Sequence, residues 1–468
     1  MRRTRIVCTL GPSSVQPGVL RRMVSAGMDV ARFNFSHGDE PTHRRAAAMV
    51  REVAAASGRH VALMQDLQGP KIRTGRLTHP LVGLVRGSRV RLTCEDAVGH
   101  EGLVSVDQEA VLRAVRPRDR VLLSDGQIEL RVCGVDGTEA DCQVVRGGLL
   151  GERKGVAVPG RALDLPPFTP KDLCDLQLGA ELGFDYVALS FIRSGDDVRA
   201  CRRAMVECGV DRPVIAKLER AQALSHLSEI ISQVDAVMVA RGDLGVELSI
   251  GEVPAAQKDI IQRANRMGVP VITATEMLES MVTSNRPTRA EASDVANAIW
   301  DGTDAVMLSQ ETSTGAHPVD AVRAMARICL SAERHPSFQR ERKLWKEGTV
   351  ATAMAHAAAG VAEEVQARAI IAFTESGSTA LHVSKAHPVV PVIAASPHAD
   401  VLRRTALYSG VVPLQAENGE DTDTMIENAT RAARTGGLVR RNDRIVLVAG
   451  VPVGTPGQTN LVKVGTVE

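Results

Sequence analysis

Four short phrases combine a cation, carboxylates, a hydroxyl group and glycine, and together they could perform chemistry on phosphate. They are Asn34-Phe35-Ser36-His37, Ala216-Lys217-Leu218-Glu219, Ala240-Arg241-Gly242-Asp243 and Ala274-Thr275-Glu276-Met277-Leu278-Glu279. Each phrase comes at or just past the end of a short apolar run that precedes a helix-like stretch. In a parallel barrel of alternating strands and helices, catalytic groups gather at such strand ends. This set of groups suits a divalent metal ion and an anionic, phosphate-bearing substrate.

Two carboxylates are candidates for binding the metal ion. Lys217 and Glu219 lie two residues apart on one expected strand, so their side chains share a face. Such a pair indicates either a metal or substrate site or a buried ion pair. Asp243 follows Arg241-Gly242, a phrase also typical of an ordinary turn, although glycine allows a ligand to approach the backbone closely. Because Mg²⁺ commonly takes one or two carboxylates, Glu219 and Asp243 form a candidate Mg²⁺ pair.

A second polar group is expected nearby. Arg32, Asn34 and Ser36 alternate along one expected strand, and Asp66 ends the next strand. A hydrogen-bonded structural cluster would explain any one of these residues, but four polar side chains at adjacent strand ends favour a functional site. Thr275 is a candidate site residue because it lies at the end of an expected strand. For His37 the alternatives are a catalytic base, a structural residue or a nucleotide contact.

The overall composition excludes several classes of protein. The net charge of +1 gives no indication of a nucleic-acid partner. The eight cysteines contain no Cys-x-x-Cys pair, which favours free thiols in a reducing cytoplasm over disulfides or a zinc site. The basic N-terminus lacks the apolar core of a signal peptide, and no apolar stretch is long enough to span a membrane. We therefore expect a cytoplasmic protein without membrane or nucleic-acid partners.

The sequence predicts that eight strand–helix units position these residues. The expected strands are Arg5 to Leu10, Val30 to Phe35, Val61 to Leu67, Tyr186 to Phe191, Val214 to Glu219, Ala236 to Ala240, Val271 to Thr275 and Ala305 to Ser309. Most are continuous apolar runs, as in strands covered on both faces. Helix-like stretches such as 257–267 and 290–300 lie between them. Eight such units predict a (β/α)8 TIM barrel of roughly 250 residues.

Two further parts interrupt or follow this pattern. Turn signals and short alternating runs between Pro70 and Pro166 predict a small inserted β-barrel domain, with one hairpin across Asp125-Gly126, placed to act as a lid. A helix at 349–364 and strands at 369–373, 391–395, 411–414 and 444–449 predict a C-terminal α/β domain. The charged segment 331–348 is expected to be an exposed connector. The expected domains are 1–69 with 167–337, 70–166 and 338–468.

The order of these motifs resembles pyruvate kinase along the whole chain. The matching phrases are Thr9-Leu10-Gly11-Pro12-Ser13-Ser14, Ala31-Arg32-Phe33-Asn34-Phe35-Ser36-His37-Gly38, Asp66-Leu67-Gln68-Gly69-Pro70-Lys71-Ile72-Arg73-Thr74-Gly75, Lys154-Gly155, Lys217-Leu218-Glu219, Arg241-Gly242-Asp243-Leu244-Gly245, Met277-Leu278-Glu279-Ser280-Met281 and Arg286-Pro287-Thr288-Arg289-Ala290-Glu291. The resemblance implies phosphoryl transfer from phosphoenolpyruvate to ADP, with Mg²⁺ or alternatively Mn²⁺, in a cytoplasmic homotetramer with an allosteric C-terminal domain.

The resemblance also implies residue roles. Glu219 and Asp243 match Mg²⁺ ligands, and Lys217 and Arg32 match cations that contact the phosphoryl group. The Gly242 and Asp243 amides and the Thr275 hydroxyl match the substrate carboxylate site, while Thr275 and Ser309 are candidates for the proton relay. The nucleotide-binding set comprises Asn34, Phe35, Ser36, His37, Arg73 and Lys154. The loop with Thr374, Ser376, Ser378 and Thr379 is expected to bind a phosphorylated effector, and Glu375 in it favours a monophosphate.

The sequence departs from the family pattern at three positions. Asn34, Ser36 and Asp66 match a monovalent-cation site, but Lys71 stands where K⁺-dependent members carry Glu. We therefore expect a K⁺-independent enzyme in which Lys71 pairs with Asp66 or with substrate phosphate; a solvated surface lysine is the alternative. Glu276 replaces a common Gln and Gln310 a common Gly. A non-catalytic effector-sensing scaffold and a Mg²⁺-dependent lyase remain open as alternative functions.

Overall fold

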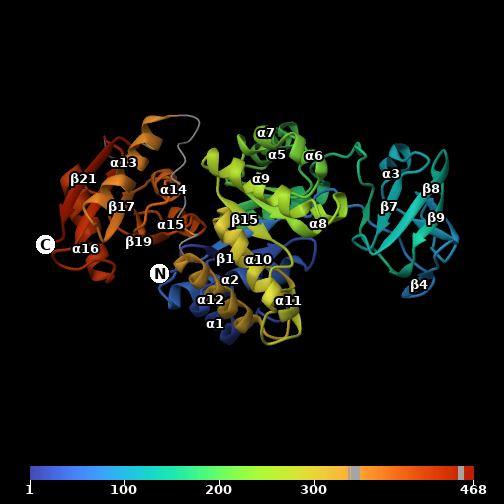
Figure 1. Ribbon diagram of the computed structural model, residues 1–468, viewed down its shortest axis with the longest axis horizontal. Helices are drawn as coiled ribbons and strands as arrows, with labels where there is room; N and C mark the ends of the chain where they lie inside the picture. The colour runs from blue at the N-terminus through green and yellow to red at the C-terminus, as the bar shows by residue number, and fades with distance from the viewer. Residues whose placement is uncertain (336–337, 339–347, 452–457) are drawn as a thin grey trace.

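The structure is a computed structural model that describes residues 1–335, 338, 348–451 and 458–468. Figure 1 shows three parts along its long axis, with a barrel in the centre, an inserted β-rich segment at one end and a C-terminal α/β part at the other. No helix in the described part of the chain is long and apolar enough to cross a membrane.

The central part is a closed barrel of eight parallel strands, as predicted. Around the barrel the strands run β1 (Arg5–Thr9), β16 (Ala305–Leu308), β15 (Val271–Ala274), β14 (Ala236–Ala240), β13 (Val214–Leu218), β12 (Tyr186–Leu189), β3 (Ala62–Asp66) and β2 (Val30–Asn34). Nearly all their residues are buried, since side chains fill the interior and helices cover the outside. The predicted strands are confirmed, although most end one or two residues earlier than expected.

Helical segments follow the strands of the barrel. They are α1 (Pro17–Ala26), α2 (Glu40–Ala56), α4 (Pro170–Glu181), α5 (Gly195–Glu207), α6 (Ala221–Ser225), α7 (Leu227–Ile231), α8 (Arg241–Glu247), α9 (Val253–Arg266), η1 (Glu279–Val282), α10 (Arg289–Asp301), α11 (Gln310–Ser313) and α12 (Pro318–Arg334). In α10, Thr288 and Glu291 form a capping box, and Gly302 ends the helix with φ 109°. Because α12 continues to Arg334 and buries Ala332, the predicted connector is wrong over 331–334; residues 336–337 and 339–347 of it lie outside the described residues.

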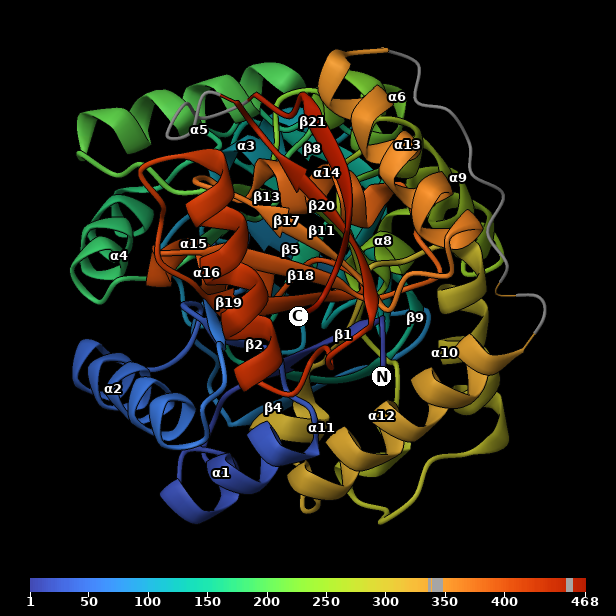
Figure 2. The ribbon, with the colours of Figure 1, turned by 90° about the vertical axis from the view of Figure 1, so that its left-hand side faces the viewer.

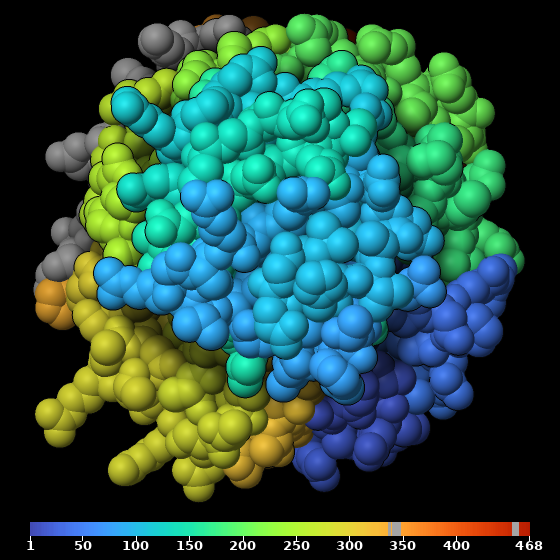
Figure 3. Space-filling model, turned by 90° about the vertical axis from the view of Figure 1, so that its right-hand side faces the viewer, coloured from blue at the N-terminus to red at the C-terminus, as the bar shows by residue number. Residues whose placement is uncertain are grey.

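The inserted segment follows β3 and contains two sheets and one helix. Its elements are β4 (Leu81–Leu84), β5 (Arg89–Thr93), β6 (Leu103–Ser105), α3 (Glu109–Ala114), β7 (Arg120–Leu123), β8 (Ile128–Asp136), β9 (Glu139–Arg146), β10 (Gly148–Gly151) and β11 (Val156–Ala157). One sheet has the order β11-β7-β8-β9-β5-β6, and β10 pairs with β4. The predicted hairpin is confirmed, since β7 and β8 are antiparallel across Asp125-Gly126. Seen from its side, this segment lies in front of the barrel (Figure 3).

The C-terminal part is a five-stranded sheet with helices on both sides (Figure 2). Its elements are α13 (Val350–Glu364), β17 (Ala369–Phe373), α14 (Ser378–Lys385), β18 (Val392–Ser396), α15 (Ala399–Thr405), β19 (Val411–Gln415), α16 (Thr422–Thr435), β20 (Arg444–Ala449) and β21 (Leu461–Thr466). The sheet order is β19-β18-β17-β20-β21. Four strands were predicted; the fifth, β21, pairs antiparallel with β20 and was missed.

The C-terminal part packs on the barrel face where the strands begin. Lys385 Nζ, fully buried, lies 2.9 Å from Asp304 Oδ2 and donates to Asn265 Oδ1 at 2.6 Å. Arg403 pairs with Asp185 at 2.9 Å. Leu407 belongs to the same apolar cluster as the side chains inside the barrel. The inserted segment and the C-terminal part therefore contact opposite faces of the barrel.

Candidate active site

A buried lysine is the centre of the polar groups at the strand ends. Lys217 Nζ lies 2.7 Å from Glu219 Oε1 and 3.1 Å from Asp66 Oδ1, and it donates to Ser190 Oγ at 2.8 Å. Glu219 Oε2 accepts the backbone N–H of Phe191 at 2.7 Å. The structure therefore brings together residues from the ends of β13, β3 and β12, and Ser190 is a partner that the sequence reasoning missed.

Arg32 joins this network from the opposite side of Asp66. Its Nε donates to Asp66 Oδ2 at 2.6 Å, and its Nη1 donates to Thr9 Oγ1 at 2.9 Å. Asp66 is 1% exposed, and its two carboxylate oxygens pair with different cations, Arg32 and Lys217. The pairing of Lys71 with Asp66 that the sequence suggested is absent among the described residues.

The electrostatics of these groups follow from burial and pairing. Burial lowers the pKa of Lys217, but the Asp66 and Glu219 carboxylates outweigh burial and hold that pKa above its ordinary value. For Asp66, burial raises the pKa, and the charges of Lys217 and Arg32 outweigh it, so the pKa is lowered. Burial and, less strongly, Asp243 raise the pKa of Glu219 despite Lys217. A further positive charge beside Glu219 would therefore favour its ionised form.

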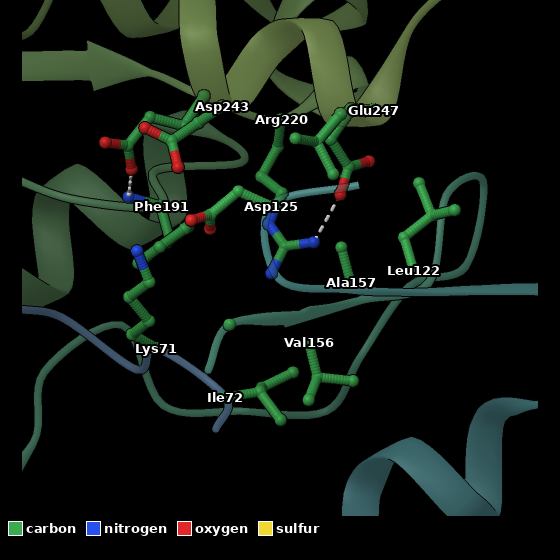
Figure 4. A pocket seen from close by; sticks show the side chains of 13 residues that line it. Lys71, Ile72, Leu122, Asp125, Val156, Ala157, Phe191, Arg220, Asp243 and Glu247 are labelled. Carbon is green, nitrogen blue, oxygen red and sulfur yellow. Dashed lines mark hydrogen bonds and ion pairs between the residues drawn. The ribbon is translucent and has the colours of Figure 1, made fainter. Parts of the chain in front are cut away.

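The network opens into a pocket between the barrel and the inserted segment. The pocket has a volume of about 40 Å³ and is lined by Lys71, Ile72, Leu122, Asp125, Gly155, Val156, Ala157, Phe191, Glu219, Arg220, Asp243, Val246 and Glu247. Figure 4 shows Asp243 on the barrel side, while Lys71 and Asp125 extend into the pocket from the inserted segment. Arg220 pairs with Glu247 and lies 5.2 Å over the Phe191 ring. Two predicted metal ligands, Glu219 and Asp243, therefore share one pocket.

Thr275 and Gly242 meet at the ends of β15 and β14. The backbone N–H of Gly242 donates to Thr275 Oγ1 at 2.7 Å. Thr275 Oγ1 in turn donates to the carbonyl of Ala274 at 2.6 Å. The predicted carboxylate-binding amide and the predicted hydroxyl are thus in direct contact.

Ser309 lies at the end of β16, beside a buried carboxylate. Its Oγ is buried without a hydrogen-bond partner in the described part of the chain. Its backbone N–H donates to Glu311 Oε2 at 2.6 Å, and Glu311 Oε1 accepts the N–H of Leu278 at 3.1 Å. Burial raises the pKa of Glu311. The sequence analysis assigned no role to Glu311, because a carboxylate that accepts from backbone amides has no sequence signature.

The phrase Asn34 to His37 forms the turn after β2. Asn34 Oδ1 accepts the N–H of Ser36 at 3.1 Å. The Phe35 ring is buried and stacks on the His43 ring with a centroid distance of 4.1 Å, so the ring is not available to a ligand. The backbone N–H of Phe35 donates to the Asp66 carbonyl at 2.9 Å, and its carbonyl accepts from Lys171 Nζ at 2.8 Å. His37 is exposed, and partial desolvation together with the charges of Arg73 and Lys71 lowers its pKa.

Arg73 and Lys154 lie side by side in the inserted segment. An antiparallel bridge joins Arg73 to Gly155, and Arg73 Nη1 donates to the carbonyl of Arg153 at 3.1 Å. The N–H of Lys154 donates to Thr74 Oγ1 at 2.9 Å, and its side chain is exposed. Neither residue lines the pocket beside Glu219, so they are not part of the buried network.

The predicted effector residues lie in the loop that leads into α14. Thr374 Oγ1 accepts the N–H of Gly377 at 2.9 Å, and the exposed hydroxyls of Ser376 and Ser378 are 3.4 Å apart. Thr379 Oγ1 lies 3.0 Å from Thr459 Oγ1 in a buried contact, which turns this hydroxyl away from the surface. The carboxylate of Glu375 in the same loop is 2.8 Å from His398 Nε2 and accepts from Asn418 Nδ2 at 2.8 Å.

Comparison with known proteins identifies the family. A family model described as "Pyruvate kinase, barrel domain" matches residues 1–322, and one described as "Pyruvate kinase, alpha/beta domain" matches residues 352–465. The chain belongs to the pyruvate kinase family. As a member of the pyruvate kinase family it is a phosphotransferase.

Individual pyruvate kinases match along nearly their whole length. The pyruvate kinase of Corynebacterium glutamicum is 44% identical over 466 residues, which cover 99% of this chain and 97% of that protein. The pyruvate kinase of Mycobacterium tuberculosis is 42% identical and covers 99% and 98%. A crystal structure of a pyruvate kinase from Cryptosporidium parvum superposes with a TM-score of 0.92 at 35% identity, covering 100% of this chain and 96% of that one.

The two departures from the pyruvate kinase pattern near the site are both exposed. Glu276 follows Thr275 and has φ 53°, and Gln310 opens α11. Neither lines the pocket with Glu219 and Asp243. Their side chains thus lie outside the buried network that a pyruvate kinase of this geometry presents to a ligand.

Proposed function

We propose that this chain transfers the phosphoryl group of phosphoenolpyruvate to ADP, giving ATP and pyruvate. The observation that carries the proposal is the position of Lys217, a buried ammonium group balanced by Asp66 and Glu219 at the barrel's strand ends. Phosphoryl transfer needs positioning and neutralisation of charge more than covalent catalysis. A fixed cation in a site from which water is largely excluded supplies such neutralisation.

The donor set fits a divalent metal ion. Glu219 and Asp243 line one pocket, and the raised pKa of Glu219 results from burial and from its carboxylate neighbour. No cluster of three or more metal-ligating side chains occurs among the described residues, but Mg²⁺ commonly uses one or two carboxylates with water and substrate oxygens. When bound, Mg²⁺, or Mn²⁺ in its place, would neutralise charge on phosphoryl oxygens.

The chain's own residues then have distinct tasks. Lys217 and Arg32 contact the phosphoryl oxygens, and the amides of Gly242 and Asp243 bind the substrate carboxylate. Because the Gly242 amide donates to Thr275 Oγ1 in this structure, the carboxylate must displace that hydroxyl. Thr275 and Ser309 are then placed to supply the proton that converts the enolate into pyruvate. Asn34, the backbone of Phe35, Ser36, His37, Arg73 and Lys154 contact the nucleotide, the last two when the inserted segment closes.

The monovalent-cation site is proposed to need no K⁺. Asn34 Oδ1 already accepts from Ser36, and Asp66 is balanced by Arg32 and Lys217. Lys71 extends into the pocket beside Glu219, where its ammonium group can meet substrate phosphate (Figure 4). Of the two partners expected for Lys71, Asp66 and substrate phosphate, we therefore propose the substrate phosphate.

Regulation and assembly complete the proposal. The exposed hydroxyls of Ser376 and Ser378 at the start of α14 suit a phosphate group, and Glu375 favours a monophosphate over a bisphosphate. The free cysteines support a cytoplasmic location. The family suggests a homotetramer, which light scattering on the purified protein would test.

One assay decides the reaction. Pyruvate formation from phosphoenolpyruvate, coupled to lactate dehydrogenase, is measured with Mg²⁺ in the presence and absence of ADP. We expect pyruvate only when ADP is present, with one ATP formed for each pyruvate. Pyruvate formation independent of ADP would indicate a lyase or phosphatase, and absence of pyruvate under both conditions would indicate a scaffold without activity.

A further inference from the structure

The backbone at the end of β15 adopts a conformation that its residues disfavour. Thr275 has φ 67° and Glu276 has φ 53°, both in the left-handed region. For a β-branched residue such as Thr275 this conformation is unusual, because the side chain crowds the backbone. Such a conformation persists only when surrounding contacts hold it. The residues that hold Thr275 are therefore part of how its hydroxyl is placed.

Arg241 supplies those contacts from the neighbouring strand end. Its Nη2 donates to the carbonyl oxygen of Thr275 at 2.7 Å, and its Nε lies 3.2 Å from the carbonyl oxygen of Ala274. The Thr275 carbonyl lies within the left-handed turn, and the Ala274 carbonyl immediately precedes it. The planar guanidinium group can hold two acceptors at fixed angles, which a lysine ammonium group cannot do in the same way.

Asp294 fixes the guanidinium group in turn. Arg241 Nη1 lies 2.8 Å from Asp294 Oδ1 and 2.7 Å from Asp294 Oδ2, and Gln257 Oε1 accepts from the same nitrogen at 3.4 Å. The Arg241 side chain is 11% exposed and that of Asp294 is 38% exposed, so the guanidinium group is largely shielded from water while the carboxylate is partly accessible. Asp294 belongs to α10 and Gln257 to α9, so two helices outside the barrel determine the orientation of Arg241.

Arg241 is also adjacent to the amide that Thr275 contacts. Gly242 follows Arg241 directly, and its N–H donates to Thr275 Oγ1 at 2.7 Å. A shift of Arg241 would therefore move the Thr275 carbonyl and the Gly242 amide together. We propose that Arg241, oriented by Asp294, is a positioning residue that keeps Thr275 in its left-handed turn and so places the Thr275 hydroxyl for proton delivery to the enolate.

This inference rests on the proposed function, since it deepens the role of Thr275 in it. In the step concerned, the hydroxyl O–H bond breaks and a C–H bond forms at the methylene carbon of the enolate, which becomes the methyl group of pyruvate. The hydroxyl group regains a proton from water. Phosphoryl transfer precedes this step and depends on Lys217 and Arg32, which Arg241 does not contact. Misplacing Thr275 should thus affect protonation more than phosphoryl transfer.

The test compares Arg241→Lys and Asp294→Asn with the unaltered protein. Two rates are measured: ATP formation from phosphoenolpyruvate and ADP, and exchange of the pyruvate methyl hydrogens in D₂O followed by NMR. We expect methyl exchange to fall about 10- to 100-fold, the scale for a small misplacement of a reacting group. ATP formation should fall by a clearly smaller factor, and the KM for phosphoenolpyruvate should change little.

A matched control and the contrary results complete the test. Arg263→Lys makes the same change in an Arg–Asp pair on the exterior of α9, where Arg263 Nε lies 2.9 Å from Asp259 Oδ1, and both rates should stay normal. Unchanged methyl exchange in both folded variants would overturn the proposal. Equal losses in both rates, or failure of both variants to fold, would overturn it too and would show that Arg241 and Asp294 only stabilise the fold. If the unaltered protein makes no ATP, the proposed function itself fails.

Discussion

Lys217 Nζ lies 2.7 Å from Glu219 Oε1 and 3.1 Å from Asp66 Oδ1, so one buried ammonium group balances two buried carboxylates. Glu219 and Asp66 are each 1% exposed and depend on protein charges for their ionised forms. The same ammonium group lies where we propose that the transferred phosphoryl group binds. Under this proposal, one side chain both balances the buried carboxylates and takes part in catalysis.

Replacing Lys217 with Met should abolish most of the activity. The variant lacks the cation that offsets developing phosphoryl charge, and we expect turnover to fall on the order of 10²-fold or more. Thermal unfolding and circular dichroism would establish that the variant is folded. Lys258→Met is the control, since Lys258 is an exposed lysine that also pairs with an aspartate, Asp301, on the barrel exterior. Near-normal turnover of folded Lys217→Met would contradict the assigned role.

The enzyme should be active without K⁺ but not without Mg²⁺. Activity in tetramethylammonium salts at constant ionic strength should match activity in K⁺ salts, because Lys71 already supplies a positive charge to the pocket. Lys71→Glu should create a requirement for K⁺. Lys463→Glu reverses the charge of a surface lysine on β21 and should leave the salt response unchanged. Strong activation of the unaltered enzyme by K⁺ would refute this prediction.

A monophosphate effector should lower the phosphoenolpyruvate concentration needed for half-saturation. Ser376→Ala combined with Ser378→Ala removes the two exposed hydroxyls at the start of α14 and should abolish this response without changing basal turnover. Ser232→Ala removes an exposed hydroxyl from the barrel and serves as the matched control. If titration with sugar monophosphates and nucleoside monophosphates changes nothing, or if the double variant responds normally, this loop is not the effector site.

Stability should fall as the pH drops below about the ordinary histidine pKa of 6.5, in part because of His43. Burial, in part against the Phe35 ring, lowers the pKa of His43, and Lys171 lowers it further. Asp175, a hydrogen bond with the His37 backbone and Asp39 have smaller opposing effects. Below 6.5 the unfolded chain binds a proton more readily than the folded chain, so protonation favours unfolding.

Urea unfolding at several pH values measures this effect. His43→Gln should show a shallower loss of stability between neutral pH and mildly acidic pH, whereas His79→Gln, which changes an exposed histidine in the inserted segment, should keep the original slope. An identical slope in His43→Gln and the unaltered protein would show that His43 does not titrate in this range.

The barrel could be predicted because its signal is local. Runs such as Ala236–Ala240 are apolar at every position, and the structure buries all of them. By contrast, β21 was missed because Leu461–Thr466 is half-exposed and forms a strand only by pairing with β20. Edge strands of this kind take their conformation from a partner, and no feature of their own sequence determines it.

In the candidate site, too, some residues could be predicted from the sequence and others could not. Lys217 lies near the end of the buried strand β13, Glu219 follows that strand and Asp243 comes shortly after β14, so their grouping could be inferred from the periodicity and the order of strands. Arg241 and Asp294 are more than fifty positions apart, and nothing in either local sequence indicates that they form a pair around the Thr275 turn. The positive φ of Thr275 likewise depends on that tertiary contact.

The apolar contact of Leu407 with the barrel interior limits how this protein can be recombined. Leu407 packs with the side chains at the centre of the barrel, and Lys385 gives Asp304 its buried cation. A chimera that joins this barrel to a relative's C-terminal part must keep both partners, since a buried carboxylate without its cation costs about 3–5 kcal/mol. The barrel and the C-terminal sheet are therefore expected to have diverged as one inherited unit.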